Sequence, residues 1–153
     1  MSFDNAEHLA QQLKNEIRNS LKLTCSIGIS PNKLLSKIAS DFKKPDGLTT
    51  VKPEQAEQFL SPLKIREIPG IGKKTEDVFT QMDIHIIEEL RKIDVFDLNK
   101  MFGRKTGGYI FNSAKGIDNE IVKERPPTIQ FSKIVTLKKN SKELEFLQGN
   151  VNE

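Results

Sequence analysis

The stretch Ile68-Pro69-Gly70-Ile71-Gly72-Lys73-Lys74-Thr75 decides how the middle of this 153-residue chain folds. Proline fixes one φ angle, and two glycines one residue apart allow backbone conformations that a side chain would forbid. A helical pattern resumes directly afterwards with Val78, Phe79 and Met82. The sequence therefore predicts a short glycine hairpin, with Gly72 at positive φ, that leads straight into the N-terminus of a helix.

The predicted helix N-terminus is a favourable place for an anion. Its first N–H groups have no partner inside the helix, and the helix dipole adds partial positive charge. Lys73 and Lys74 add full positive charge at the same point. With no catalytic group near in the sequence, we predict that the hairpin binds the phosphates of a nucleic-acid backbone. The alternative is a tight turn between packed helices, to which Ile65, Ile68 and Phe79 contribute only apolar contacts.

Composition narrows the class of protein. The formal net charge of +3 suits nucleic-acid binding without proving it. The single cysteine, Cys25, excludes an internal disulfide and is expected to be a small apolar residue of a strand in a cytoplasmic protein. His8 and His85 lack metal-ligand spacing, so no zinc site is expected. No apolar run is long enough to cross a membrane, and no secretory signal is recognised.

Residues 1–51 read as helix, strand, helix, strand. Apolar residues recur at three- and four-residue steps from Ala6 to Leu21, which predicts an amphipathic helix. Residues 23–29 alternate between apolar and polar, which predicts a strand buried on one face. Ser30-Pro31 is typical of a helix start, with a capping hydroxyl and proline at the first helical position. That helix should end before Pro45-Asp46-Gly47, and residues 48–51 should form a second strand.

Residues 52 to about 118 are predicted to be helical throughout. Gly107-Gly108 lies inside the last predicted helix, where close helix packing is favoured over the approach of a ligand, and Gly116 should close that helix. The two prolines that end residues 121–128 predict an extended linker. Apolar residues between 129 and 137 share strand parity but have no partner strand in sequence. Incomplete units at both ends indicate a fragment of a longer protein.

Four motifs, in the family's order, resemble the Y-family translesion DNA polymerases, especially bacterial DNA polymerase IV and its archaeal homologues. The resemblance covers about residues 5 to 140. Two thumb positions differ from the family pattern: Asp83 stands where a glycine is usual, and Ile86 stands where a capping threonine is common. The motifs are Ser26-Ile27-Gly28-Ile29-Ser30 with residues 32–35 and 37–41, Lys44-Pro45-Asp46-Gly47 with aspartate for the usual asparagine, the hairpin Ile68 to Thr75, and Phe102-Gly103, Tyr109-Ile110 and Lys115-Gly116-Ile117-Asp118.

The resemblance implies an α+β fragment in four parts. Residues 1–51 would be the C-terminal part of an α/β palm domain. Residues 52–120 would be a mainly α-helical thumb domain with a helix-hairpin-helix. Residues 121–128 would be the linker, and residues 129–153 the truncated start of a little finger domain with one strand.

The implied function is that of a fragment of an error-prone DNA-directed DNA polymerase, a nucleotidyltransferase for lesion bypass in DNA repair. Its partners would be primer–template DNA, the incoming nucleotide triphosphate and, as a further candidate, a sliding clamp, with no membrane. Family members hold two magnesium ions with three palm carboxylates. Those motifs lie upstream of the matching part, so no catalytic or metal-binding residue is carried over, and this chain alone is expected to be inactive.

The resemblance also assigns site residues. Lys44 matches the family lysine that reaches the incoming triphosphate; judged from the residues alone, it is an exposed lysine at a helix C-terminus. DNA binding is expected at six hairpin residues: Gly70, Ile71, Gly72, Lys73, Lys74 and Thr75. The contacting groups would be the amides of Gly70, Gly72 and Lys73 and the side chains of Lys73, Lys74 and Thr75. Backbone carbonyls near Ile68 and Ile71 are candidate ligands for a monovalent cation. Glu76 departs from the small residue common in such hairpins.

The role of several further lysines is open at this point, and so are two other classes of protein. Lys33 and Lys37 share a helix face that faces either phosphate or solvent, and the same alternatives hold for Lys138-Lys139. A non-catalytic helix-hairpin-helix module of a recombination or repair protein would bind DNA as well. A helical protein-interaction domain, in which the glycines only shape turns, would not.

Overall fold

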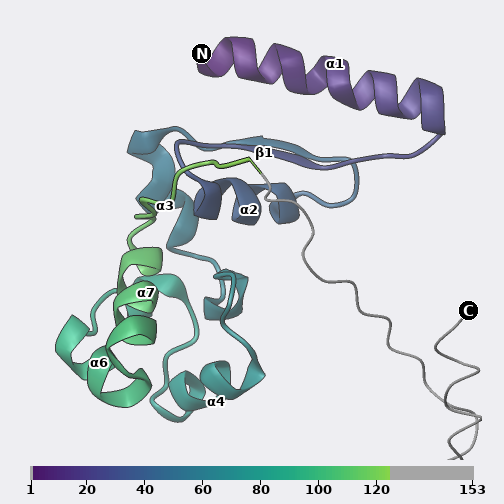
Figure 1. Ribbon diagram of the computed structural model, residues 1–153. Coiled ribbons are helices and arrows are strands. Elements are labelled where there is room, and N and C mark those ends of the chain that lie inside the picture. Colours follow the sequence, from purple (N-terminus) through teal and green to yellow (C-terminus); the bar gives the residue numbers. More distant parts are fainter. Residues whose placement is uncertain (1, 125–153) are drawn as a thin grey trace, which may run out of the picture. The chain divides into compact units, whose positions relative to one another are not determined.

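The structure, a computed structural model, describes residues 2–124 (Figure 1). The linker prolines and the predicted strand of residues 129–137, with Lys138 and Lys139, lie outside the described residues. The elements in chain order are α1 (Phe3–Leu21), β1 (Ile27–Ile29), α2 (Lys33–Phe42), β2 (Leu48–Thr50), η1 (Pro53–Gln55), α3 (Ala56–Leu60), η2 (Ile65–Glu67), α4 (Lys73–Gln81), α5 (Ile87–Leu90), α6 (Val95–Phe102) and α7 (Arg104–Ala114).

Two short strands form the sheet of the N-terminal region. β1 and β2 run parallel, with Ile27 opposite Leu48 and Ile29 opposite Thr50. Helix α2 connects them and lies so close to β1 that a side chain at Gly28 would overlap the Ser36 carbonyl oxygen. The α+β class is therefore confirmed, with a sheet as small as the sequence predicted.

The prediction of a strand from residue 23 was wrong, because β1 begins only at Ile27. Leu23 is 60% exposed, and Cys25 precedes the strand instead of lying in it. The carbonyl oxygen of Cys25 accepts a hydrogen bond from the Lys14 ammonium group at 2.6 Å instead of one from a neighbouring strand. The alternating pattern thus begins four residues before the backbone has a strand partner.

The predicted start of the second helix was also wrong. α2 begins at Lys33, and its N-cap is Asn32, whose side-chain oxygen accepts a hydrogen bond from the Leu35 N–H at 2.9 Å. The Ser30 hydroxyl instead donates to the Asn32 carbonyl oxygen at 2.7 Å. Asparagine can fill both roles required here, because its amide nitrogen also donates to the Gly116 carbonyl oxygen at 2.8 Å.

The helical region from Pro53 onward has a continuous apolar core. Phe79 of α4 is fully buried, and its ring centroid lies 5.2 Å from that of Phe102 in α6. Helices α6 and α7 pack so closely that a side chain at Gly107 would come within 2.6 Å of the Asn99 backbone nitrogen, which confirms the packing interpretation of this glycine. Gly116 has a φ of +71° just after α7, in agreement with its predicted capping role.

No helix within residues 2–124 has the length and apolar character needed to cross a membrane.

Candidate nucleic-acid interface

The glycine hairpin is a tight turn between a 3-10 turn and an α-helix. The Ile71 N–H donates to the Ile68 carbonyl oxygen at 3.1 Å, and Gly70 has a φ of +86°. Proline at the second position and glycine with positive φ at the third are typical of a type II turn. The first helix of the predicted helix-hairpin-helix is only the three-residue η2.

The structure corrects the expected role of Gly72. Its φ of −89° and ψ of 176° are ordinary extended values, so the positive φ belongs to Gly70 instead. A side chain at Gly72 would meet nothing within 4 Å. Gly72 acts as the N-cap of α4, where its carbonyl oxygen accepts hydrogen bonds from the N–H groups of Thr75 and Glu76. The open space beside Gly72 leaves its backbone accessible to a ligand.

Apolar residues on both sides attach the hairpin to the core. Ile65, Ile68 and Phe79 are 1%, 0% and 0% exposed, as the packing interpretation requires. Ile71 is 6% exposed, and its N–H is used inside the turn. Within the hairpin, Ile71 is therefore a packing residue whose amide is not available to DNA.

Four backbone amides of the hairpin have no acceptor within the described residues. They are the N–H groups of Gly70, Gly72, Lys73 and Lys74, of which the sequence assigned the first three to phosphate. All four residues are exposed. A helix N-terminus with unpaired N–H groups and a favourable dipole is an anion-binding arrangement.

Charged side chains around the hairpin differ in sign. Lys73 and Lys74 are exposed and have no carboxylate partner in the part of the chain that the structure describes. Glu76, in the first turn of α4, lies 3.5 Å from Arg66. The carboxylate interacts favourably with the helix dipole, but it also adds negative charge close to the amides that would bind phosphate.

Lys44 lies outside the hairpin, at the turn after α2. Its ammonium group forms an ion pair with Asp41, whose carboxylate also accepts a hydrogen bond from Lys37. Hydrogen bonds from Lys37 and then Lys44 lower the pKa of Asp41 below its ordinary value. Lys37 is therefore paired within the chain, and Lys33 likewise pairs with Glu120 at 2.6 Å.

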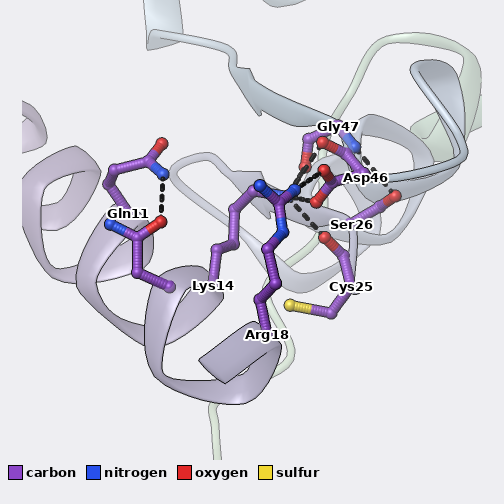
Figure 2. A network of polar contacts seen from close by, with 8 residues as sticks. Gln11, Lys14, Arg18, Cys25, Ser26, Asp46 and Gly47 are labelled. Atoms are coloured by element: carbon purple, nitrogen blue, oxygen red, sulfur yellow. Dashed lines mark hydrogen bonds and ion pairs between the residues drawn. The ribbon is translucent and has the colours of Figure 1, made fainter. Parts of the chain in front are cut away.

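A buried lysine, which was not predicted from the sequence, holds the turn that carries Lys44. Lys14 of α1 is 7% exposed and donates to the carbonyl oxygens of Cys25, Asp46 and Gly47 at 2.6, 2.8 and 3.3 Å. It also donates to the Asp46 carboxylate at 2.6 Å, and Arg18 pairs with the other oxygen of that carboxylate (Figure 2). Hydrogen bonds from Lys14, and then the charge of Arg18, lower the pKa of Asp46.

The position of Lys14 in an amphipathic pattern did not reveal this role. Lysine is normally exposed, and its partners lie 11 and 32 residues away in sequence. The only signal was the aspartate at position 46, where the family motif has asparagine.

Contacts far apart in sequence also join α2 to the end of α7. Asn32 donates to the Gly116 carbonyl oxygen, as described above, and the Leu34 N–H donates to the Asp118 carboxylate at 3.1 Å. Asp118 thereby satisfies one of the free N–H groups at the start of α2. These bonds fix the chain that leaves the helical region against the N-terminal region.

Within residues 2–124, no three histidine, cysteine, aspartate or glutamate side chains gather where they could hold a metal ion. The described residues therefore do not fit the two-magnesium site that the resemblance implies for the longer protein.

Two family models match the chain. Residues 66–118 match a family described as "DNA polymerase-iota, thumb domain", and residues 1–41 match the impB/mucB/samB family. The first match contains the hairpin and helices α4 to α7, and the second contains α1, β1 and most of α2.

Curated relatives and solved structures agree with these matches. DNA polymerase IV of Nitrosopumilus maritimus is 66% identical over 97% of this chain, and that of Methanosarcina acetivorans is 43% identical over 95%. The chain spans 41% and 40% of the lengths of these two relatives.

A DinB family error-prone DNA polymerase from Sulfolobus solfataricus is 30% identical, with a TM-score of 0.73 over 97% of this chain and 44% of that structure. An insertion ternary complex of Dbh DNA polymerase is 33% identical, with a TM-score of 0.72 over 80% of this chain and 36% of that one. Motifs, fold and relatives coincide, and the chain belongs to the Y family of DNA polymerases, in the branch of DNA polymerase IV.

Proposed function

We propose that the hairpin binds the sugar-phosphate backbone of primer–template DNA, as part of an error-prone DNA polymerase that bypasses lesions. The observation that carries the proposal is the coincidence, within residues 2–124, of four unpaired amides, at Gly70, Gly72, Lys73 and Lys74, with the unpaired side chains of the last two residues at one helix N-terminus. Backbone amides and lysines on phosphates hold a duplex without reading its bases, so binding would tolerate any sequence. The membership in the polymerase family favours this over a non-catalytic DNA-binding module or a protein-interaction domain.

The proposed parts of the polymerase follow the boundaries predicted from the sequence. Residues 1–51 would complete the palm, residues 52–120 would form the thumb, residues 121–128 would link it to the little finger, and residues 129–153 would begin that domain. The match of residues 66–118 to a thumb model supports the second of these assignments. Magnesium would be supplied to the reaction by palm residues of the longer protein, and the sliding clamp and the cytoplasmic location stay predictions.

The hairpin proposal is tested by fluorescence anisotropy of duplex DNA at several salt concentrations. Release of counterions from a few phosphates gives a log–log salt slope of about −2 to −4, and removal of both charges in Lys73→Ala/Lys74→Ala should flatten it by up to about two. The matched control is Lys92→Ala/Lys100→Ala, which removes the same charge from exposed thumb positions outside the hairpin. Equal effects of the two double variants would show that binding is only a general attraction.

The two glycines give a second, independent test of the same site. Gly72→Ala adds a methyl group into open space, so the melting temperature should change little, while roughly tenfold of the DNA affinity should be lost because the methyl group crowds a bound phosphate. Gly70→Ala places alanine at a φ of +86° and should cost about 1–2 kcal/mol of folding free energy. Unchanged DNA affinity in folded Gly72→Ala would contradict phosphate binding at this amide.

We also propose that Lys44 contacts the triphosphate of the incoming nucleotide. Its exposure and its place in the Lys-Pro-Asp-Gly turn support this, and nucleotide binding would require it to leave Asp41. In a polymerase that contains this segment, Lys44→Ala should raise the KM for nucleotide while the Kd for DNA stays unchanged. A change in the DNA Kd alone would contradict the assignment.

A monovalent cation at the hairpin would have to bind backbone carbonyls near Ile68 and Ile71. The Ile68 carbonyl oxygen already accepts one hydrogen bond, from Ile71, and keeps a second lone pair for a cation. Replacement of potassium by tetramethylammonium at constant ionic strength should weaken DNA binding if such a cation takes part.

A further inference from the structure

Tyr109 of α7 contacts the hairpin from a position 40 residues away in sequence. Its hydroxyl group donates a hydrogen bond to the Pro69 carbonyl oxygen at 2.6 Å. Its ring edge, at Cε1, lies 3.7 Å from the place where a side chain on Gly70 would begin. The residue is 43% exposed, so it does not serve mainly to fill the core.

This hydrogen bond fixes the direction of a neighbouring amide. The Pro69 carbonyl and the Gly70 N–H belong to the same peptide unit, and in a planar trans peptide these two groups point in opposite directions. Because the carbonyl points to Tyr109, the Gly70 N–H points away from it. That N–H is one of the four hairpin amides without an acceptor among the described residues.

The hydrogen bond from Tyr109 disfavours the alternative orientation of this peptide unit. Type I and type II turns differ mainly in the orientation of their central peptide, which here joins Pro69 to Gly70. Rotation to the type I orientation would turn the carbonyl oxygen toward the side from which phosphate approaches, and two oxygens would then face each other. A hydrogen bond to the carbonyl oxygen stabilises the type II orientation and also polarises the N–H of the same peptide as a donor.

We propose that Tyr109 is a positioning residue of the hairpin, which holds the Pro69–Gly70 peptide in the orientation that presents the Gly70 N–H to DNA phosphate. The inference rests on the proposed DNA-binding function of the hairpin. It adds a residue of α7, outside the hairpin, to the determinants of DNA affinity.

The test is Tyr109→Phe, which keeps the ring and removes only the hydroxyl group. DNA affinity should fall by roughly three- to tenfold, the range expected for one net hydrogen bond. The salt slope should stay as in the unaltered chain, because no charge is removed. The matched control is Thr80→Val, which removes an exposed thumb hydroxyl that donates to the Glu76 carbonyl oxygen instead of to the hairpin.

A second measurement follows the amide itself. In ¹⁵N-labelled protein titrated with a short DNA duplex, the Gly70 N–H signal should shift strongly in the unaltered chain and weakly in Tyr109→Phe. Melting temperatures are measured on the same samples, and the Phe variant should melt close to the unaltered chain. An equal Gly70 shift in both proteins, or an affinity loss no larger than in Thr80→Val, would overturn the role of Tyr109.

The outcome separates this inference from the function on which it rests. If Lys73→Ala/Lys74→Ala weakens DNA binding and Tyr109→Phe does not, the hairpin binds DNA without help from Tyr109. If neither variant weakens DNA binding, the hairpin is not the DNA site, and both the function and the inference are wrong.

Discussion

Helix α1 and the helical thumb region are held in place by different forces. In α1, residues 3–21, only Ala10 and Lys14 are buried, and this helix is attached to the following turn mainly through Lys14, Arg18 and Asp46. The region from η2 to α7 instead surrounds fully buried apolar side chains such as Phe79 and Leu98. The comparison predicts that the thumb depends on volume and shape, and the attachment of α1 on charge and pH.

The largest effect is expected when a buried side chain of the thumb core is made smaller. Phe79→Ala should destabilise the protein by about 3–5 kcal/mol, because a fully buried aromatic ring is replaced by a cavity. Urea denaturation followed by circular dichroism measures the loss. Because Ile65 and Ile68 pack in the same core, the hairpin should lose DNA binding at the same denaturant concentration at which the thumb unfolds. A loss below about 1 kcal/mol would show that the thumb core is not closely packed.

The corresponding change in the N-terminal region is Lys14→Ala. It should cost about 2–3 kcal/mol, because three carbonyl oxygens and one carboxylate lose a charged donor. Hydrogen exchange of residues 3–21 and 44–47 should rise while that of α4 to α7 stays slow. The control is Lys22→Ala, at the end of the same helix, whose ammonium group donates among residues 2–124 only to the nearby Asn19 carbonyl oxygen. Equal loss of protection in the thumb would mean that the two regions unfold as one unit.

Asp46→Asn tests the role of pH. The folded pKa of Asp46 is lowered, so its stabilising contribution is present above the pKa of the unfolded chain, near pH 4, and is lost as the pH falls through the lower folded value. The unaltered chain should therefore melt above Asp46→Asn at pH 7, and the difference should shrink below about pH 4. Asp77→Asn, at an exposed position in α4, is the control. A difference independent of pH would assign the effect to shape instead of charge.

The smallest effect is expected from a change of charge beside the hairpin. Glu76→Gln removes a negative charge from the first turn of α4 and leaves Arg66 unpaired. Stability should change by less than about 1 kcal/mol, because the ion pair is exposed. DNA affinity should rise about two- to threefold at low salt, because repulsion of phosphate is removed, and the gain should vanish at high salt. Unchanged affinity at low salt would place Glu76 away from the phosphate.

The sequence predicted elements best where one local pattern was sufficient. The helix that ends at Leu21, the hairpin before α4 and the capping role of Gly116 all follow from apolar spacing, proline and glycine. The predicted start of α2 was wrong because two residues that can cap a helix, Ser30 and Asn32, stand close together. The hydrogen bond from Asn32 to Gly116 explains why Asn32 is the N-cap. The strand from residue 23 was wrong because alternation does not reveal where the partner strand ends.

Within the candidate site, the sequence predicted which amides bind phosphate but did not predict the bond from Tyr109 to Pro69. Gly70, Gly72 and Lys73 were expected at the phosphate, and their N–H groups have no acceptors among the described residues. Which glycine has the positive φ could not be predicted, because both glycines allow it and only the packed turn selects one.

Local spacing and turn residues act over a few positions, and they were therefore sufficient to predict the order of elements, the family and the position of the hairpin. Tertiary packing instead places Lys14 against Asp46, the Asp118 carboxylate at the Leu34 N–H and the Tyr109 hydroxyl at the Pro69 carbonyl oxygen. Each of these bonds joins residues at least 32 positions apart. Hydrogen-bond partners at such separation are chosen when packing brings them together, and no periodicity along the chain encodes that meeting.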